Sequence, residues 1–132
     1  MPISYNVLND GHFIYAKTSG NVTGQEFVDY EISHAIDKRL RAPISELIEL
    51  ENDSLKFISE NDISKIMDQR EKIMRLPNPH RCAIIVSLGD IHAWNLARYY
   101  EGMVTLHYPE DVIVFGDEVV ARAWLGIDSY IH

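Results

Sequence analysis

The segment that most restricts the fold is residues 82–88, a nearly continuous apolar run bounded by turn-forming residues. A strand that is apolar on both faces must be covered on both faces, as in the middle of a parallel sheet. Parallel neighbours are joined through crossover segments, which are usually helices. The run therefore predicts an α/β domain with a central, mainly parallel sheet.

Strand-like and helix-like patterns alternate along the rest of the chain. Strands are predicted at residues 3–8 and 13–18, joined by the turn Asn9-Asp10-Gly11 as an antiparallel hairpin. Two more strands are predicted at residues 44–50 and 112–115. The expected order is β-β-α-β-α-β-α-β-α. This order predicts a mixed, mainly parallel five-stranded sheet with right-handed crossovers.

Capping residues predict where the helices begin, and apolar spacing predicts which of their positions are buried. Thr23 begins the first helix with a capping box and the apolar pattern continues to about residue 40. Ser59 begins the second, Asp90 caps a third that runs to about residue 103, and Asp117 caps a short fourth. The expected buried positions are Val28, Ile32, Ala35, Ile36 and Leu40 in the first helix, Ile63, Ile66, Met67, Ile73 and Met74 in the second, and Ala93, Leu96, Ala97, Tyr100 and Met103 in the third.

Length, charge and cysteine content narrow the class of protein. The chain has 132 residues, which fits a single domain spanning residues 1–132. Its formal net charge of −8 disfavours nucleic acid and anionic membrane surfaces as partners. No apolar run is long enough to predict a membrane span, and the N-terminus does not resemble a signal peptide. The lone cysteine, Cys82, is expected to be buried and fits a cytoplasmic location.

Sequence motifs for catalysis, metals and cofactors are absent. The six histidines include no pair with ligand spacing, and no Walker-type loop, Gly-x-Gly-x-x-Gly turn or Gly-x-Ser-x-Gly elbow occurs. Glu46 is an even step from Ile44 and Ile48 and shares their face of the strand. A strand end or a sheet edge is the expected place for such an acid. We therefore predict no catalytic residue, metal or cofactor, and leave open a site assembled across the fold.

The predicted helix after Asp90 carries apolar residues outside its core stripe. Ile91, Trp94 and Tyr99 lie among polar neighbours. A large aromatic ring often folds over the edge of a core. The alternative is an exposed anchor for a dimer, a partner or a ligand. On that alternative the sequence predicts a homodimer.

Three segments taken together resemble STAS domains, in particular the SpoIIAA-like branch. Residues 14–23 are similar to the second strand and the Gly-x-Val/Leu-Thr helix start of that family. Residues 81–86, followed by Ala97-Arg98, and the closing segments 114–118 and 121–125 resemble its later strands and its terminal Val-Phe … Ala-x-x-Trp-Leu signature. The resemblance spans residues 3 to about 126 and implies a mostly parallel sheet and a non-enzymatic domain. The best-known members antagonise anti-sigma factors and are switched by phosphorylation of a serine at a helix start.

The resemblance also suggests where a partner would bind. The family pattern Phe-x-Asp-Ser-Ser-Gly falls on residues 57–62, where Ser59 takes the aspartate position and Glu60 the phosphorylated one, and the glycine is missing. The usual phosphoswitch is thus expected to be absent, unless Ser59 or Ser54 serves as the phosphorylated residue. The candidate partner-binding residues are Asp53, Ser54, Ser59, Glu60, Trp94 and Tyr99.

Three functional hypotheses follow from the sequence. The leading one is a non-enzymatic, STAS-like regulatory domain that acts in signalling through a protein partner. The first alternative is a carrier or sensor of a small apolar, lipid-like ligand, with a cavity lined by Met67, Met74, Leu96 and Tyr100. The second is an enzyme whose site is assembled from distant loops.

Overall fold

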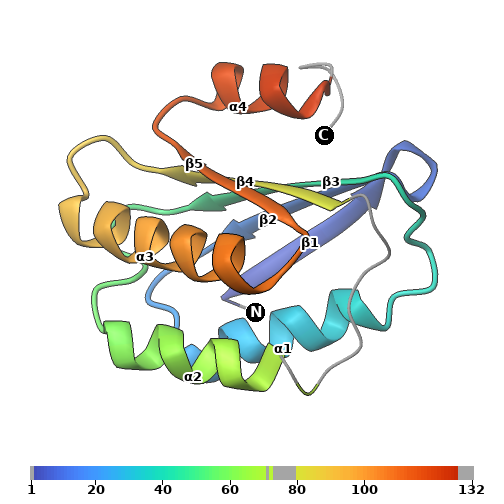
Figure 1. Ribbon diagram of the computed structural model, residues 1–132. Helices are drawn as coiled ribbons and strands as arrows, with labels where there is room; N and C mark the ends of the chain where they lie inside the picture. The colour runs from blue at the N-terminus through green and yellow to red at the C-terminus, as the bar shows by residue number, and fades with distance from the viewer. Residues whose placement is uncertain (1, 71, 73–79, 128–132) are drawn as a thin grey trace.

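A five-stranded mixed sheet lies at the centre of the computed structural model, which describes residues 2–70, 72 and 80–127 (Figure 1). The strands follow chain order across the sheet, and only the first pair is antiparallel. This arrangement confirms the predicted α/β class and the predicted N-terminal hairpin. The strands are β1 (Ile3–Leu8), β2 (Phe13–Thr18), β3 (Ile44–Leu50), β4 (His80–Val86) and β5 (Asp111–Phe115).

Helices cover both faces of the sheet, but unequally. One face carries α1 (Gly24–Ala35), α2 (Glu60–Arg70) and α3 (Ile91–His107), and among the described residues the other carries α4 (Glu118–Leu125) alone (Figure 1). The pleat of the strands divides their side chains between these two layers. In β3, Ile48 and Leu50 belong to the large core beneath α1, α2 and α3, whereas Leu47 packs in the smaller core beneath α4. Glu46 alternates with Leu47 and so faces the three-helix layer.

A short 3-10 helix, Asn9–Gly11, connects β1 to β2 where the sequence predicted only a turn. Gly11 has a φ of +95°, a left-handed conformation that favours glycine. A Cβ atom there would also collide with the backbone oxygen of Arg39. The hairpin turn therefore requires glycine at this position both for its backbone conformation and for its packing.

The first helix ends earlier than predicted and buries a partly different face. It ends at Ala35, and Ile36 is 67% exposed. Val28 is buried as predicted, but Ile32 is also exposed, so the predicted apolar face was only partly correct. Tyr30 and His34 are buried in addition, because their side chains face the buried Glu46 of the sheet.

The other helices agree more closely with the sequence pattern. Ile63, Ile66 and Met67 are buried in α2 as predicted, whereas positions 73 and 74 lie outside the described residues. Ala93, Leu96 and Ala97 are buried in α3 as predicted, and the helix continues past residue 103 to His107. None of the helices in the described part of the chain has the length and apolar character needed to cross a membrane.

Candidate functional site

The centre of the candidate site is Glu46, a carboxylate in the middle of the sheet. It is 4% exposed and pairs with Ile14 of β2 on one side and Cys82 of β4 on the other. The prediction that Glu46 lies at a strand end or sheet edge was therefore wrong. Burial is tolerated because other polar side chains satisfy both carboxylate oxygens, which is the general requirement for a buried charge.

Both oxygens of Glu46 have polar partners from other elements. The Tyr30 hydroxyl in α1 donates to Oε2 at 2.5 Å. Nε2 of His80, the first residue of β4, lies 2.8 Å from Oε1. Nε2 of His34 in α1 lies 4.0 Å from Oε2. Glu46 thus contacts side chains from both α1 and β4.

A second group of ion pairs continues from His80 toward α2. Nδ1 of His80 lies 3.6 Å from Oε1 of Glu110, which directly precedes β5. Arg70, the last residue of α2, donates from Nη2 to Oε2 of Glu110 at 2.6 Å and from Nη1 to the Tyr100 hydroxyl at 2.5 Å. Nε of Arg70 lies 3.8 Å from Glu31 Oε2. We call the six ionisable residues the charged cluster: Glu31, His34, Glu46, Arg70, His80 and Glu110.

The charges of this cluster balance when both histidines are protonated. Three carboxylates then face one guanidinium and two imidazolium groups. Burial lowers the pKa of His34, but the neighbouring Glu31, Glu46 and Glu110 outweigh burial and raise this pKa to about 9. Burial also lowers the pKa of His80, and its carboxylate neighbours again give a net rise. Burial raises the pKa of Glu46, yet the two histidines bring it well below its ordinary value.

His34 differs from the other members because its hydrogen bonding is incomplete. The residue is 3% exposed, and neither ring nitrogen makes a hydrogen bond to the described part of the chain. Nε2 lies 3.3 Å from Glu31 Oε2, a distance that suits an ion pair. The ring packs edge-on against Tyr30, with centroids 4.7 Å apart. A buried polar side chain without hydrogen bonds calls for an explanation.

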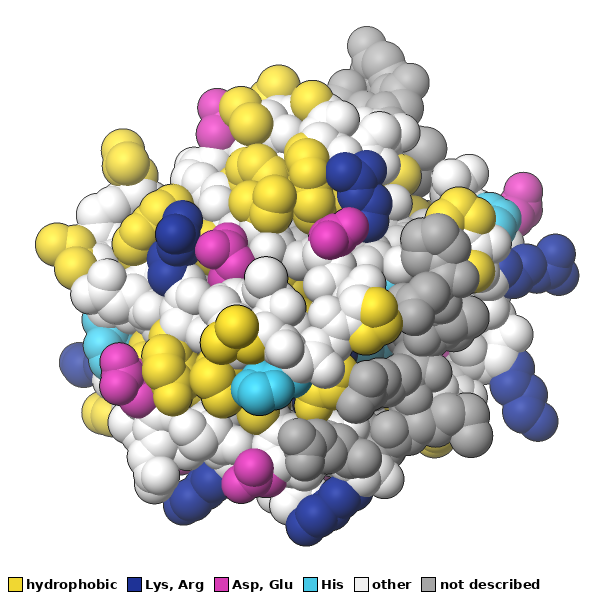
Figure 2. All heavy atoms as spheres, in the orientation of Figure 1, with side chains coloured by type: hydrophobic (Ala, Val, Ile, Leu, Met, Phe, Trp, Pro, Cys, Tyr) yellow, Lys and Arg dark blue, Asp and Glu magenta, His cyan; other side chains and the backbone are white. Residues whose placement is uncertain are grey.

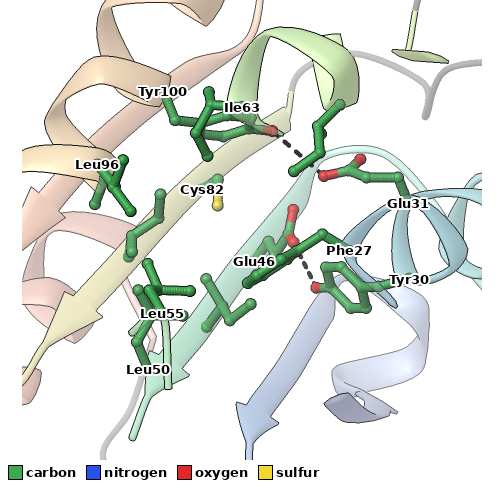
Figure 3. A pocket seen from close by; sticks show the side chains of 14 residues that line it. Phe27, Tyr30, Glu31, Glu46, Leu50, Leu55, Ile63, Cys82, Leu96 and Tyr100 are labelled. Atoms are coloured by element: carbon green, nitrogen blue, oxygen red, sulfur yellow. Dashed lines mark hydrogen bonds between the residues drawn. The ribbon is translucent and has the colours of Figure 1, made fainter. Parts of the chain in front are cut away.

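A cavity of about 70 Å³ lies beside the charged cluster, between the sheet and the three-helix layer (Figure 3). Most of its lining is apolar, with Leu50, Leu55 and Leu96 at one end. Glu31, Glu46 and the hydroxyl groups of two tyrosines lie toward the other end (Figure 3). A single water occupies about 10–15 Å³ of such a cavity, so there is room for a short organic group.

The predicted lining of such a cavity was partly correct. Leu96 and Tyr100 line it, Met67 is buried without being among its lining residues, and position 74 lies outside the described residues. Cys82 also lines the cavity. Burial, reinforced by the charge of Glu46, raises the pKa of the Cys82 thiol well above its ordinary value, so this cysteine is a weak nucleophile.

The residues predicted to bind a partner lie in two connected segments. The backbone amide of Asp53 donates to Asp90 Oδ2 at 2.9 Å, and His92 Nε2 contacts the Ile58 carbonyl oxygen at 2.8 Å. These bonds join the loop before α2 to the start of α3. Ser59 and Glu60 are exposed on this loop and helix start. Ser54 is 1% exposed, which places its hydroxyl out of contact with solvent.

Predictions about three individual side chains can also be compared with the structure. Ser59 acts as a helix cap: its hydroxyl accepts from the Asp62 amide at 3.3 Å, and its amide donates to Asp62 Oδ2 at 2.8 Å. Trp94 is 39% exposed, which lies between a ring folded over the edge of the core and a fully exposed anchor. Tyr99 packs partly against the core, and its hydroxyl lies 3.4 Å from Ser64 Oγ.

Sequence reasoning missed the charged cluster as a unit because its members come from five separate places in the chain. One local signal was available: Phe27, Tyr30, Glu31 and His34 follow the spacing of a single helix face. The even step of Glu46 from two buried isoleucines was another. Neither signal shows which strands and helices bring their side chains together.

The fold class is the α/β class predicted from the sequence, with a mixed sheet and four α-helices among the described residues. Comparisons of the chain with models of protein families, with curated proteins and with solved structures found no match. The resemblance to STAS domains therefore stays a prediction.

Proposed function

We propose that this domain binds a small, mainly apolar ligand in the cavity between β3, β4 and the three-helix layer. The observation that carries the proposal is the cavity itself, which is apolar at one end and lined by carboxylates and tyrosine hydroxyls at the other. Apolar pockets with a few convergent polar groups are the usual form of a small-molecule site. The proposal corresponds to the carrier or sensor predicted as the first alternative.

The polar end of the cavity selects the ligand's head group. Glu31 and Glu46 line the cavity with their carboxylates, whereas Arg70 and the two histidines that balance their charge are not among its lining residues. These carboxylates favour a hydroxyl or an ammonium group and repel a carboxylate. We therefore expect an amphipathic ligand with a donor head, and not a fatty-acid anion.

The arrangement favours binding over catalysis. Glu46 is a weak base because its pKa is lowered and both of its oxygens already have partners. Cys82 is a weak nucleophile for the reason given above. The pair of His80 and Glu46 is nevertheless the kind of group that an enzyme assembled from distant segments would use. A hydrolase or transferase activity found with small amphipathic substrates would replace the binding proposal.

Three probes with one tail and different head groups test the proposal: hexanol, hexylamine and hexanoate. Each is titrated into ¹⁵N-labelled protein in the presence of a chelator, and amide shifts are followed by NMR. The expected result is saturable binding of hexanol and hexylamine at residues around the cavity, with hexanoate bound roughly tenfold more weakly, about 1.4 kcal/mol. Equal binding of all three probes, or shifts confined to surface residues, would overturn the proposal.

A variant that fills the cavity provides the matching control. Ala97 in α3 is buried and lines the cavity, whereas Leu106 on the same helix is 78% exposed. Ala97→Phe should abolish binding of the probes, and Leu106→Phe should leave it unchanged. Circular dichroism on both variants shows whether the fold survives. If Ala97→Phe is folded and still binds the probes, the ligand does not occupy this cavity.

A second candidate function is the STAS-like regulatory interaction predicted from the sequence. It is supported by the resemblance and by exposed apolar side chains at the start of α3 and in the segments before α2 and α3. We call these the α3-start patch: Phe57, Leu88, Ile91 and Trp94. Figure 2 shows the described part of one face of the molecule, where apolar side chains alternate with polar and charged ones. The α3-start patch is the candidate for contact with another protein.

A second copy of the chain is the partner that this patch is proposed to contact. Size-exclusion chromatography with light scattering should show a dimer that Ile91→Ser and Trp94→Ala weaken. Val119→Ser, an exposed apolar residue in α4, is the control and should not change the dimer. A monomer at all concentrations would remove the homodimer.

A further inference from the structure

We propose that Glu46, His80 and Glu110 form a binding site for a divalent transition-metal ion such as Zn²⁺. One ligand atom from each of these residues lies within 4.8 Å of the others, and all three residues are buried or nearly so. They come from the middle of β3, the start of β4 and the residue before β5, so the sheet itself holds their backbones in place. Glu46 also lines the cavity of the proposed apolar ligand, but His80 and Glu110 do not, so the two proposals are tested separately.

His34 is the second observation that points to an ion at this position. The side chain is buried, both ring nitrogens lack a hydrogen bond to the described residues, and Nε2 lies 4.0 Å from Glu46 Oε2. Nε2 makes ion-pair contacts with Glu31 and Glu46 but no hydrogen bond to the described residues, so this nitrogen suits a fourth ligand. Structural zinc sites are almost always four-coordinate.

The charge of the cluster agrees with a divalent ion. Glu31, Glu46 and Glu110 contribute three negative charges and Arg70 one positive charge, so neutral imidazoles leave a net charge of −2. One divalent cation brings this total to zero. In the metal-free cluster the two imidazolium protons supply the same two positive charges, so a divalent cation that displaces these protons leaves the buried charges balanced.

The donor set selects the kind of metal. Imidazole nitrogen suits Zn²⁺, Co²⁺ and related ions, whereas Mg²⁺ and Ca²⁺ prefer oxygen donors alone. Arg70 contacts Oε2 of Glu110, which leaves Oε1 for an ion. His80 contacts one carboxylate through each ring nitrogen, so an ion must displace one of these contacts. The polar end of the cavity, where Glu46 is exposed to the void, provides the path of approach.

The test is titration of the full chain, first dialysed against a chelator and then freed of it, with Co²⁺, Zn²⁺ and Mg²⁺. Calorimetry gives the stoichiometry and affinity, and Co²⁺ absorption reports the coordination. We expect one Co²⁺ or Zn²⁺ per chain and no saturable binding of Mg²⁺. His80→Gln keeps a side-chain donor toward Glu46 and should weaken binding roughly 10- to 100-fold. His107→Gln, at an exposed position at the end of α3, should bind as the wild type does.

The outcomes decide the proposal even if a variant fails to fold. The absence of one-to-one binding to the wild type, or unchanged affinity in folded His80→Gln, overturns it. If His80→Gln is unfolded, paramagnetic effects of Co²⁺ on amides of the wild-type protein locate the ion. Effects centred on Cys82 and Val112, which pair with each other in the sheet next to the proposed ligands, support the site. Effects centred on an exposed histidine overturn it.

Discussion

Nε2 of His80 lies 2.8 Å from Oε1 of Glu46, and this contact joins the first residue of β4 to the middle of β3 on the face that carries three helices. Burying either residue alone in its charged form would cost free energy, because its partner in this ion pair would be missing. Together they connect a helix that supplies Tyr30 with the segment that supplies Glu110. The stability of the domain and both proposed binding properties therefore depend on the same few side chains.

Glu46→Gln is predicted to destabilise the domain strongly. The change removes one of three carboxylates and leaves His34 and His80 facing a neutral amide. Breaking a buried ion pair in this way costs about 3–5 kcal/mol. Urea unfolding at neutral pH, with a chelator present, measures the loss.

Glu49→Gln is the matched control on the same strand. Glu49 faces the other side of β3, and its side chain pairs with the largely exposed Lys17 at 3.8 Å. Burial and the neighbouring Glu118 raise the pKa of Glu49, so folding does not favour its charged form, and a pair with an exposed lysine contributes little; this variant should therefore lose little stability. Equal losses in the two variants would show that the charged cluster has no special role in stability.

The stability of the metal-free domain is predicted to fall as the pH rises from about 6.5 to about 9. Glu31, Glu46 and Glu110 face His34 and, against the effect of burial, raise its pKa in the folded chain from 6.5 to about 9. A raised folded-state pKa means that the protonated form is stabilised by folding. The contribution is present in full below the unfolded-state pKa and is lost as the pH passes through the folded-state pKa, up to about 3 kcal/mol.

Unfolding free energies measured at several pH values in a chelator check this dependence. His34→Gln should reduce the slope between pH 6.5 and 9. His80 titrates in the same direction and leaves part of the slope in that variant. A wild-type stability that rises with pH across this range would contradict the assignment of a charged His34.

Two glycine substitutions are predicted to have opposite effects. Gly11→Ala places a Cβ against the Arg39 backbone oxygen in a left-handed conformation and should cost more than about 1 kcal/mol. Gly102→Ala lies within α3, where an added Cβ meets no atom within 4 Å. Alanine there should stabilise the helix by roughly 0.5–1 kcal/mol. Thermal unfolding of both variants gives the signs, and a shared sign would contradict the explanation.

Cys82 is predicted to react with a thiol reagent only when the domain opens. Its side chain is buried, and burial raises the pKa of the thiol. Labelling by a disulfide reagent should be slow in native buffer and fast in denaturant. Labelling rates in intermediate urea should follow the unfolded fraction. Rapid labelling in native buffer would mean that the cavity beside Cys82 is open to the reagent.

The sequence alone determined the local structure. Thr23 and Glu26 form the predicted capping box, with the Thr23 amide donating to Glu26 Oε1 at 2.8 Å, and Asp90 accepts from the Ala93 amide as the predicted cap of α3. These bonds join residues three apart in the chain, so spacing and residue type are sufficient to predict them. The same is true of the hairpin and of the buried stripe in α3.

The tertiary structure alone decided the charged cluster. Glu46 and His80 are 34 residues apart, and Arg70 and Glu110 are 40 apart. Local patterns predicted that Glu46 lies at a strand end or sheet edge and that Ile36 is buried. Both predictions were wrong. The physical reason is that the free energy of burying a charge depends on which partners the fold brings within a few ångströms, and that distance is set by strand order and helix packing.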